Sequence, residues 1–184
     1  MVKQHQAQLP LTQSEYHGVT STTLTDKTIG QYFDDIVNAY PDNLAVVVHH
    51  QQIRWNYREY QAKVDALATG LLALGIQPGD RVGIWSPNNI EWCLTQFATA
   101  KIGAIMVCIN PAYRPEELEY SLSNVGCRAV ICADKFKSSD YLQMLNELLP
   151  ELSTSTAGKL TTLALPQLEF VIRMGTDRTP GMLN

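Results

Sequence analysis

The sequence predicts an α/β fold of three layers, in which a mainly parallel sheet carries helices on both faces. Apolar, strand-like runs begin near Arg81, Ala104 and Arg128, at successive spacings of 23 and 24 residues. Helical patterns of apolar residues lie between these runs, and Gly103 and Gly126 are placed to end the two helices. A strand, a helix and a second strand within this period form a βαβ crossover, whose strands are parallel and whose connection is right-handed.

The elements ahead of this core are a polar arm, a helix and a hairpin. Residues 1–25 are rich in Thr, Ser and Gln and predict the arm. A helical pattern begins at Thr28, with apolar residues recurring every three or four positions, and Pro41 ends it. Two short strands, Ala45–His49 and Ile53–Tyr57, follow as a hairpin whose turn lacks glycine.

A longer helix leads into the first core strand. Its apolar stripe ends next to Gly75, which suits the position after a helix, and the strand Val82–Trp85 follows a turn. Pro115, followed by two glutamates, begins a later helix, because proline suits the first helical position and acids suit the first turn. The residues of the apolar stripe are Tyr60, Val64, Leu67, Leu71 and Leu74.

The last third of the sequence predicts a helix, a loop and a strand. The helix covers Ser139–Leu149 and stops at Pro150, and the low-complexity residues 151–165 are interpreted as a loop or linker. Phe170–Met174 is expected to form the last strand. The predicted organisation is an arm over 1–25, an α/β subdomain over 26–150, and a linker with the start of a truncated next part over 151–184.

Composition excludes several classes of function. The formal net charge is −4, whereas a general nucleic-acid-binding protein needs clustered positive charge. No apolar stretch reaches the length of about 18 residues that a transmembrane helix needs, and the N-terminus lacks the apolar region of a secretory signal. The four cysteines form no CxxC pair, which favours a reducing compartment: the cytoplasm, or the mitochondrial matrix if the source is eukaryotic.

Three loops are expected at the carboxyl edge of the sheet, where α/β proteins bind ligands. They are Ser86–Asn89, Asn110–Arg114 and Asp134–Lys137. In the second loop, Arg114 could meet a phosphate and Tyr113 could stack on a flat group. The structural alternative is that the loop only turns the chain, with Tyr113 packed on the sheet edge and Arg114 solvated.

Familiar catalytic motifs are missing from the sequence. The patterns GxxxxGK[ST], GxGxxG and GxSxG do not occur, and the run Ser153–Lys159 has a single glycine, so we interpret it as a linker. No histidine lies near a cysteine at the spacing of metal ligands, and we expect no metal site. The cysteines are expected to act as small buried apolar residues.

Longer strings of residues resemble one enzyme superfamily. Residues 53–85 and 86–132 resemble two core regions of the adenylate-forming enzymes, which include acyl-CoA synthetases, luciferases and peptide-synthetase adenylation domains. The stretch SEYHGVTSTTLTDKTIGQYFDDI and the ending RTPGMLN are similar to the medium-chain acyl-CoA synthetase branch. The resemblance implies part of the N-terminal domain of the adenylate-forming fold.

The resemblance implies an ATP-dependent fatty acid–CoA ligase as the full-length parent. In that family a carboxylate attacks Mg·ATP to give an acyl-adenylate and pyrophosphate, and CoA then displaces AMP. The phosphate loop and the catalytic lysine of the family normally lie beyond the point that matches Asn184. We therefore assign no catalytic residue here and expect the 184 residues alone to be inactive, so that ATP, Mg²⁺ and CoA are cofactors and substrates of the parent.

Five residues are carried over from the resemblance as CoA contacts: Ala112, Tyr113, Arg114, Lys135 and Lys137. The expected partners are fatty acid, ATP and CoA, and no nucleic acid is expected. We also expect the chain to form a homo-oligomer through apolar surface that truncation exposes. One alternative is a standalone α/β module that binds CoA or a nucleotide without catalysis. Another is a purely structural or partner-binding domain.

Overall fold

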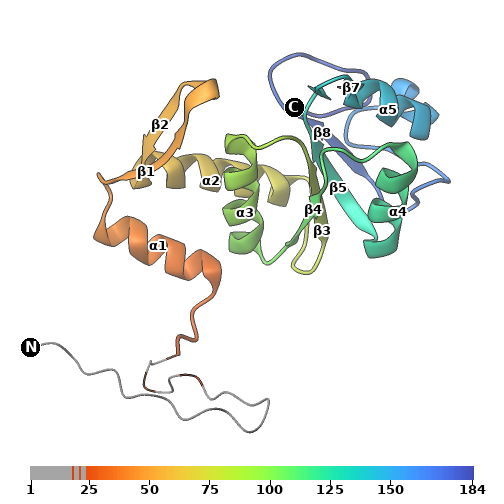
Figure 1. Ribbon diagram of the computed structural model, residues 1–184. Helices are drawn as coiled ribbons and strands as arrows, with labels where there is room; N and C mark the ends of the chain where they lie inside the picture. Colours follow the sequence, from red (N-terminus) through yellow and green to blue (C-terminus); the bar gives the residue numbers. More distant parts are fainter. Residues whose placement is uncertain (1–17, 19–20, 22–23) are drawn as a thin grey trace, which may run out of the picture.

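The computed structural model describes Gly18, Ser21 and residues 24–184, so the predicted arm over 1–25 lies almost entirely outside the described residues. The central sheet has the strand order β4-β3-β5-β8, and every neighbouring pair in it is parallel (Figure 1). This confirms the predicted parallel sheet. Its strands are β3 (Arg81–Trp85), β4 (Ile105–Ile109), β5 (Cys127–Cys132) and β8 (Phe170–Arg173).

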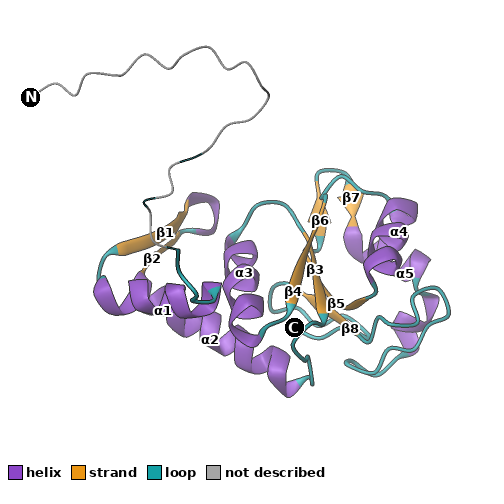
Figure 2. Ribbon diagram, turned by 90° about the horizontal axis from the view of Figure 1, so that it is seen from below, coloured by secondary structure: helices purple, strands orange, loops and turns teal. Residues whose placement is uncertain are grey.

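Helices lie on both sides of this sheet, which confirms the three-layer prediction (Figure 2). One apolar core joins the first three helices to the sheet through residues such as Phe33, Val64 and Val82. A second core joins the other two helices to the opposite face through Leu118, Val130 and Leu145. The helices are α1 (Ile29–Ala39), α2 (Tyr57–Ala73) and α3 (Ile90–Ile102) on the first side, and α4 (Pro115–Val125) and α5 (Tyr141–Leu148) on the second.

The predicted hairpin is present as β1 (Leu44–Val48) and β2 (Ile53–Asn56), which pair antiparallel. Its turn needs no glycine because Gln52 adopts the left-handed conformation, with φ 56°. Tyr57 begins α2 instead of ending the strand, since the side chain of Asn56 accepts a hydrogen bond from the Glu59 N–H and so caps the helix. The strand prediction was therefore wrong at that residue.

One glutamine ties the turn of the hairpin to the start of α3. Gln51, in the 3₁₀ turn η1 (His49–Gln51), accepts a hydrogen bond from the Ile90 N–H at 2.7 Å and donates one to Glu91 at 2.9 Å. The Ile90 N–H lies in the first turn of α3 and has no partner within the helix, so Gln51 satisfies it. The hairpin thereby docks beside the loop that follows β3.

The region after β5 departs from the prediction. Ser139 was expected to start a helix, but Lys135–Phe136 (β6) and Ser139–Asp140 (β7) form a short antiparallel hairpin, and α5 begins at Tyr141. Lys137 turns this hairpin with φ 53°. Asp140 caps α5 by accepting a hydrogen bond from the Gln143 N–H, so the helix cannot extend further back.

The segment between α5 and β8 is irregular apart from the 3₁₀ helix η2 (Pro150–Thr154). It is nevertheless packed, since five of its leucines are buried in the core beneath α4 and α5. A flexible linker would leave such side chains exposed to water. The low-complexity composition therefore did not reveal that this segment packs against the core. The buried leucines are Leu149, Leu152, Leu160, Leu165 and Leu168.

Candidate functional site

The carboxyl ends of β3, β4 and β5 meet at one edge of the sheet and carry three loops. β3 is the first of these strands in the chain and lies between the other two in the sheet. The connection through α3 leads to β4 on one side of β3, whereas β5 pairs with β3 on its other side. Such a reversal of strand order is where parallel α/β sheets bind ligands. The three predicted loops therefore do converge at a topological switch point.

Two stacked, buried aromatic rings lie beneath the loops at this edge of the sheet. Trp85, the last residue of β3, stacks on Tyr141 of α5 with ring centroids 3.6 Å apart and an interplanar angle of 9°, and both side chains are fully buried. The indole N–H of Trp85 donates to the Asn110 carbonyl at 3.2 Å. The Tyr141 hydroxyl donates to the Pro111 carbonyl at 2.5 Å. The loop after β4 is thus tied to the last residue of β3 and to the segment after β5.

Arg114 lies at the start of α4, where its backbone N–H donates to the Glu117 carboxylate at 2.7 Å. Its exposed guanidinium donates from Nη1 to the Ser139 hydroxyl at 3.2 Å. Ser139 is paired with Phe136 in the β6–β7 hairpin. The structure therefore brings Arg114 together with the hairpin that carries Lys135 and Lys137.

The other candidates differ in their exposure. Ala112 is exposed, with its N–H donating to the Asn110 side chain at 2.9 Å, and Lys135 and Lys137 are exposed as well. The Lys137 ammonium lies 5.2 Å from the centroid of the Phe136 ring. Tyr113 is half-buried against the core beneath α4 and α5, which matches the structural alternative for this residue. The exposed members of the set are thus one small residue and three cations.

In the loop after β3, the side chains of Ser86 and Asn89 form hydrogen bonds within the loop and with the start of α3. The buried Ser86 hydroxyl donates to the Pro87 carbonyl and accepts from the Asn89 side chain. Asn89 also accepts from the Trp92 N–H and so caps α3. We therefore assign no ligand contact to this loop.

Sequence reasoning missed Ser139 and Tyr141, which hold the loops together. Asp140 ahead of an apolar run is a helix-start signal that predicts α5 two residues later than expected. Nothing in the sequence indicates that the Tyr141 side chain crosses to the loop after β4, because that contact joins residues 30 positions apart. It depends on the order of strands in the sheet.

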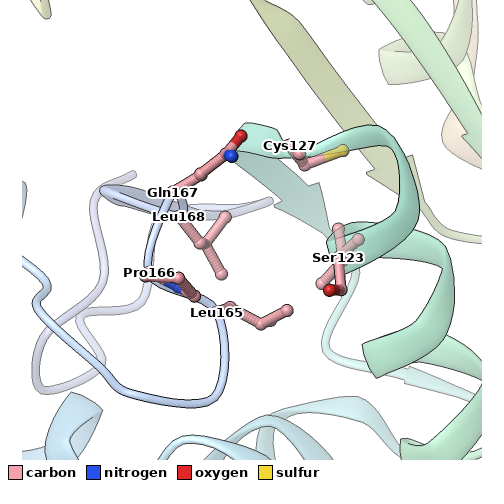
Figure 3. Close-up of a pocket in the computed structure, with 8 residues that line it drawn as sticks. Ser123, Cys127, Leu165, Pro166, Gln167 and Leu168 are labelled. Atoms are coloured by element: carbon pink, nitrogen blue, oxygen red, sulfur yellow. The ribbon is translucent and has the colours of Figure 1, made fainter.

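A small pocket lies beyond the C-terminal end of α4, beside the first residue of β5 (Figure 3). Burial raises the pKa of the Cys127 thiol to about 11, so the thiol in this pocket stays neutral near pH 7. The pocket is at the opposite edge of the sheet from the candidate loops. It is lined by Leu122, Ser123, Gly126, Cys127, Leu165, Pro166, Gln167 and Leu168.

The cysteines and histidines offer no alternative site. Cys127 and Cys132 are buried as expected, but Cys108, on the edge strand β4, is exposed. The expectation of burial was wrong for Cys108. His49 and His50 lie in the turn η1, and the described residues hold no cluster of three or more His, Cys, Asp or Glu that could bind a metal ion.

Within the part of the chain that the structure describes, none of the helices combines the length and apolarity needed to cross a membrane.

Comparison with solved structures finds the same fold in other proteins. The anthranilate CoA ligase AuaEII matches with a TM-score of 0.71 and 21% identity, over 86% of this chain and 27% of that chain. The N-terminal domain of FACL13 from Mycobacterium tuberculosis matches with a TM-score of 0.64 and 26% identity, over 80% of this chain and 34% of that chain. The first of these likenesses shows the fold alone.

Comparison of sequences identifies the family. The medium-chain acyl-CoA ligase ACSF2, mitochondrial, of Danio rerio is 45% identical over 171 residues, which are 93% of this chain and 28% of that protein. The chain thus spans a little over a quarter of the length of this curated relative. The profile described as AMP-binding enzyme matches residues 33–174. The chain therefore belongs to the family of AMP-binding enzymes and corresponds to part of an acyl-CoA ligase.

Proposed function

We propose that the protein acts in ATP-dependent ligation of a fatty acid of medium chain length to CoA, with release of AMP and pyrophosphate. The observation that carries this proposal is the 45% identity to a protein named as a medium-chain acyl-CoA ligase, over nearly the whole chain. In such a reaction the fatty acid, ATP and CoA are substrates, and Mg²⁺ accompanies ATP. For the 184 residues alone, we make a separate proposal about catalytic activity.

We propose that the 184 residues do not form an acyl-adenylate by themselves. Adenylation needs donors and cations that neutralise charge on the transferred phosphorus as it develops. The sequence contains neither GxxxxGK[ST] nor GxGxxG, and its Ser153–Lys159 run has a single glycine and begins within η2, not between a strand and a helix. A chain that does not catalyse adenylation can still bind CoA or a nucleotide. The alternative proposal is therefore a standalone module that binds one of these ligands without catalysis.

Isotope exchange between ATP and pyrophosphate tests both statements. An antibody against this segment captures the native protein from its source, and we expect exchange that depends on a fatty acid such as decanoate. The 184-residue chain alone should show no exchange above the level without acid. Acid-dependent exchange by the chain alone would contradict the second statement, and a captured native protein without exchange would contradict the first.

We propose that the carboxyl edge of the sheet contacts CoA through Ala112, Arg114, Lys135 and Lys137, with Tyr113 supporting the loop from below. CoA carries several phosphates, and the three exposed cations fit that charge. Arg114 offers a fork of N–H donors, which suits phosphate oxygens, while each lysine supplies a mobile point charge. Ala112 leaves room for a ligand to approach the backbone. The half-buried position of Tyr113 supports a packing role for its ring in place of stacking on a base.

We also propose that the chain self-associates through β4. This strand is at the edge of the sheet, and its register with β3 runs without a bulge from Ile105 to Ile109. Ile105 and Cys108 are exposed, and residues 104–109 contain no charge. Such an edge lacks the lysines, prolines and bulges that keep edge strands apart, so a second copy can extend the sheet.

Sedimentation velocity over a range of concentrations tests this association. We expect a dimer that dissociates on dilution and an Ile105→Lys variant that stays monomeric, because a charge on the edge opposes strand pairing. Ile29→Lys, at an exposed position on α1, is the matched control and should still dimerise. A wild-type monomer at every concentration, or loss of the dimer in the control as well, would contradict the assignment to β4.

The compartment we propose is a reducing one, either the cytoplasm or the mitochondrial matrix. All four cysteines are free. The Danio rerio relative is named as mitochondrial, which favours the matrix if the source is eukaryotic.

A further inference from the structure

The loops after β4 and β5 are joined by two separate hydrogen bonds. The Tyr141 hydroxyl donates to the Pro111 carbonyl, and the Arg114 guanidinium donates to the Ser139 hydroxyl. These bonds lie at opposite ends of the short stretch that carries Ala112. The donor and the acceptor are 25 positions apart in the chain in one bond and 30 in the other. The two bonds therefore fix the loops relative to each other.

Packing already fixes the ring of Tyr141, and its hydroxyl adds a separate contact. The ring is fully buried and stacked on Trp85, so a phenylalanine would fill the same space and keep the stack. The hydroxyl alone reaches out of the core to the loop. Burial raises the pKa of Tyr141 to about 12, so it keeps its proton and remains a donor at any physiological pH.

We propose that Tyr141 is a positioning residue, whose hydroxyl holds the Asn110–Arg114 loop against the β6–β7 hairpin so that Arg114, Lys135 and Lys137 face one ligand. This role rests on the proposed CoA contact at the same edge. The hydroxyl orders the loop before the ligand arrives, and a loop that is ordered in advance binds with a smaller loss of conformational freedom. Tyr141 itself touches no ligand in this account.

The chain offers a matched control for the loss of one buried hydroxyl. Tyr60, in α2, is also buried, and its hydroxyl donates to the Cys93 carbonyl at 2.7 Å on the other side of the sheet. Tyr141→Phe and Tyr60→Phe therefore remove the same kind of bond, from tyrosine to a backbone carbonyl between elements of the core. Their effects on overall stability should be similar, whereas only the first should act on the loop.

Two measurements on the 184-residue chain test the proposal. In Tyr141→Phe, hydrogen exchange at the Ala112 and Tyr113 amides should become about five-fold faster, and the dissociation constant for CoA should rise about five-fold, as expected for one lost hydrogen bond. Ser139→Ala should change both quantities in the same direction. Tyr60→Phe should change neither, although its midpoint of thermal unfolding should fall as much as that of Tyr141→Phe.

The exchange rates decide whether Tyr141 orders the loop, and the affinity for CoA decides whether this order serves the ligand. Unchanged exchange at Ala112 and Tyr113 in Tyr141→Phe, or an equal change in Tyr60→Phe, would overturn it. Faster exchange together with an unchanged affinity for CoA would also overturn it, because the loop would then be ordered without serving the ligand. If the wild-type chain binds no CoA, the proposed contact fails, and faster exchange would still show that Tyr141 orders the loop.

Discussion

Replacing Trp85 by alanine is expected to lower the free energy of unfolding by about 3–5 kcal/mol, as for other buried aromatic residues. The indole is fully buried at the end of the central strand and stacks on Tyr141. Its removal leaves a cavity against that ring, and it also leaves the Asn110 carbonyl without the indole N–H that binds it. Urea denaturation followed by circular dichroism measures the loss.

Trp85→Phe separates the two contributions. Phenylalanine keeps a ring against Tyr141 but has no N–H for the Asn110 carbonyl, so we expect a smaller loss than in the alanine variant. A loss of about 0.5 kcal/mol or less in Trp85→Ala, the size of a typical surface substitution, would show that the aromatic pair does not support the sheet edge.

Replacing Arg114 by alanine is expected to raise the dissociation constant for CoA by about ten-fold or more. A hydrogen bond to a charged group contributes about 1.5–3 kcal/mol, and about 1.4 kcal/mol corresponds to a factor of ten. The guanidinium is exposed and makes one hydrogen bond to another side chain, that of Ser139, so its loss should leave the apolar core unchanged, and Ser139→Ala measures the part of the effect that comes from this bond. Isothermal titration calorimetry at low ionic strength measures the affinity.

Arg58→Ala is the matched control for this experiment. Arg58 is also an exposed arginine and pairs with Asp42 at the open end of the β1–β2 hairpin, which is the end opposite the turn η1 that contacts α3. It should bind CoA as the wild type does. Equal affinities in wild type and Arg114→Ala would contradict the assigned contact, and an equal loss in both arginine variants would show that net charge alone governs binding.

Periodicity was enough to predict the parallel sheet and the helices that cover it. Each long element has its own signal: apolar runs for the strands, apolar spacing of three or four residues for the helices, and Gly103 or Gly126 with positive φ at their ends. The parallel direction of the strands and the two apolar faces then follow from short crossover connections, whereas the order β4-β3-β5-β8 was not predicted. These signals are local, so sequence alone exposes them.

Shorter features escaped this reasoning. The β6–β7 hairpin has two residues in each strand, too few for an alternating pattern, and its turn at Lys137 uses no glycine. The leucines after α5 lack periodicity because they pack from an irregular segment. The candidate residues were named by resemblance, and their contacts through Ser139 and Tyr141 depend on which strands become neighbours.

The most direct test of the CoA-binding edge is a titration of the 184-residue chain with CoA, followed by the backbone amide signals in nuclear magnetic resonance. We expect saturable changes concentrated at Ala112, Arg114, Lys135 and Lys137, with weaker changes along β6 and β7. An absence of change at millimolar CoA, or changes centred on the pocket beside Cys127, would contradict the placement of CoA at the carboxyl edge of the sheet.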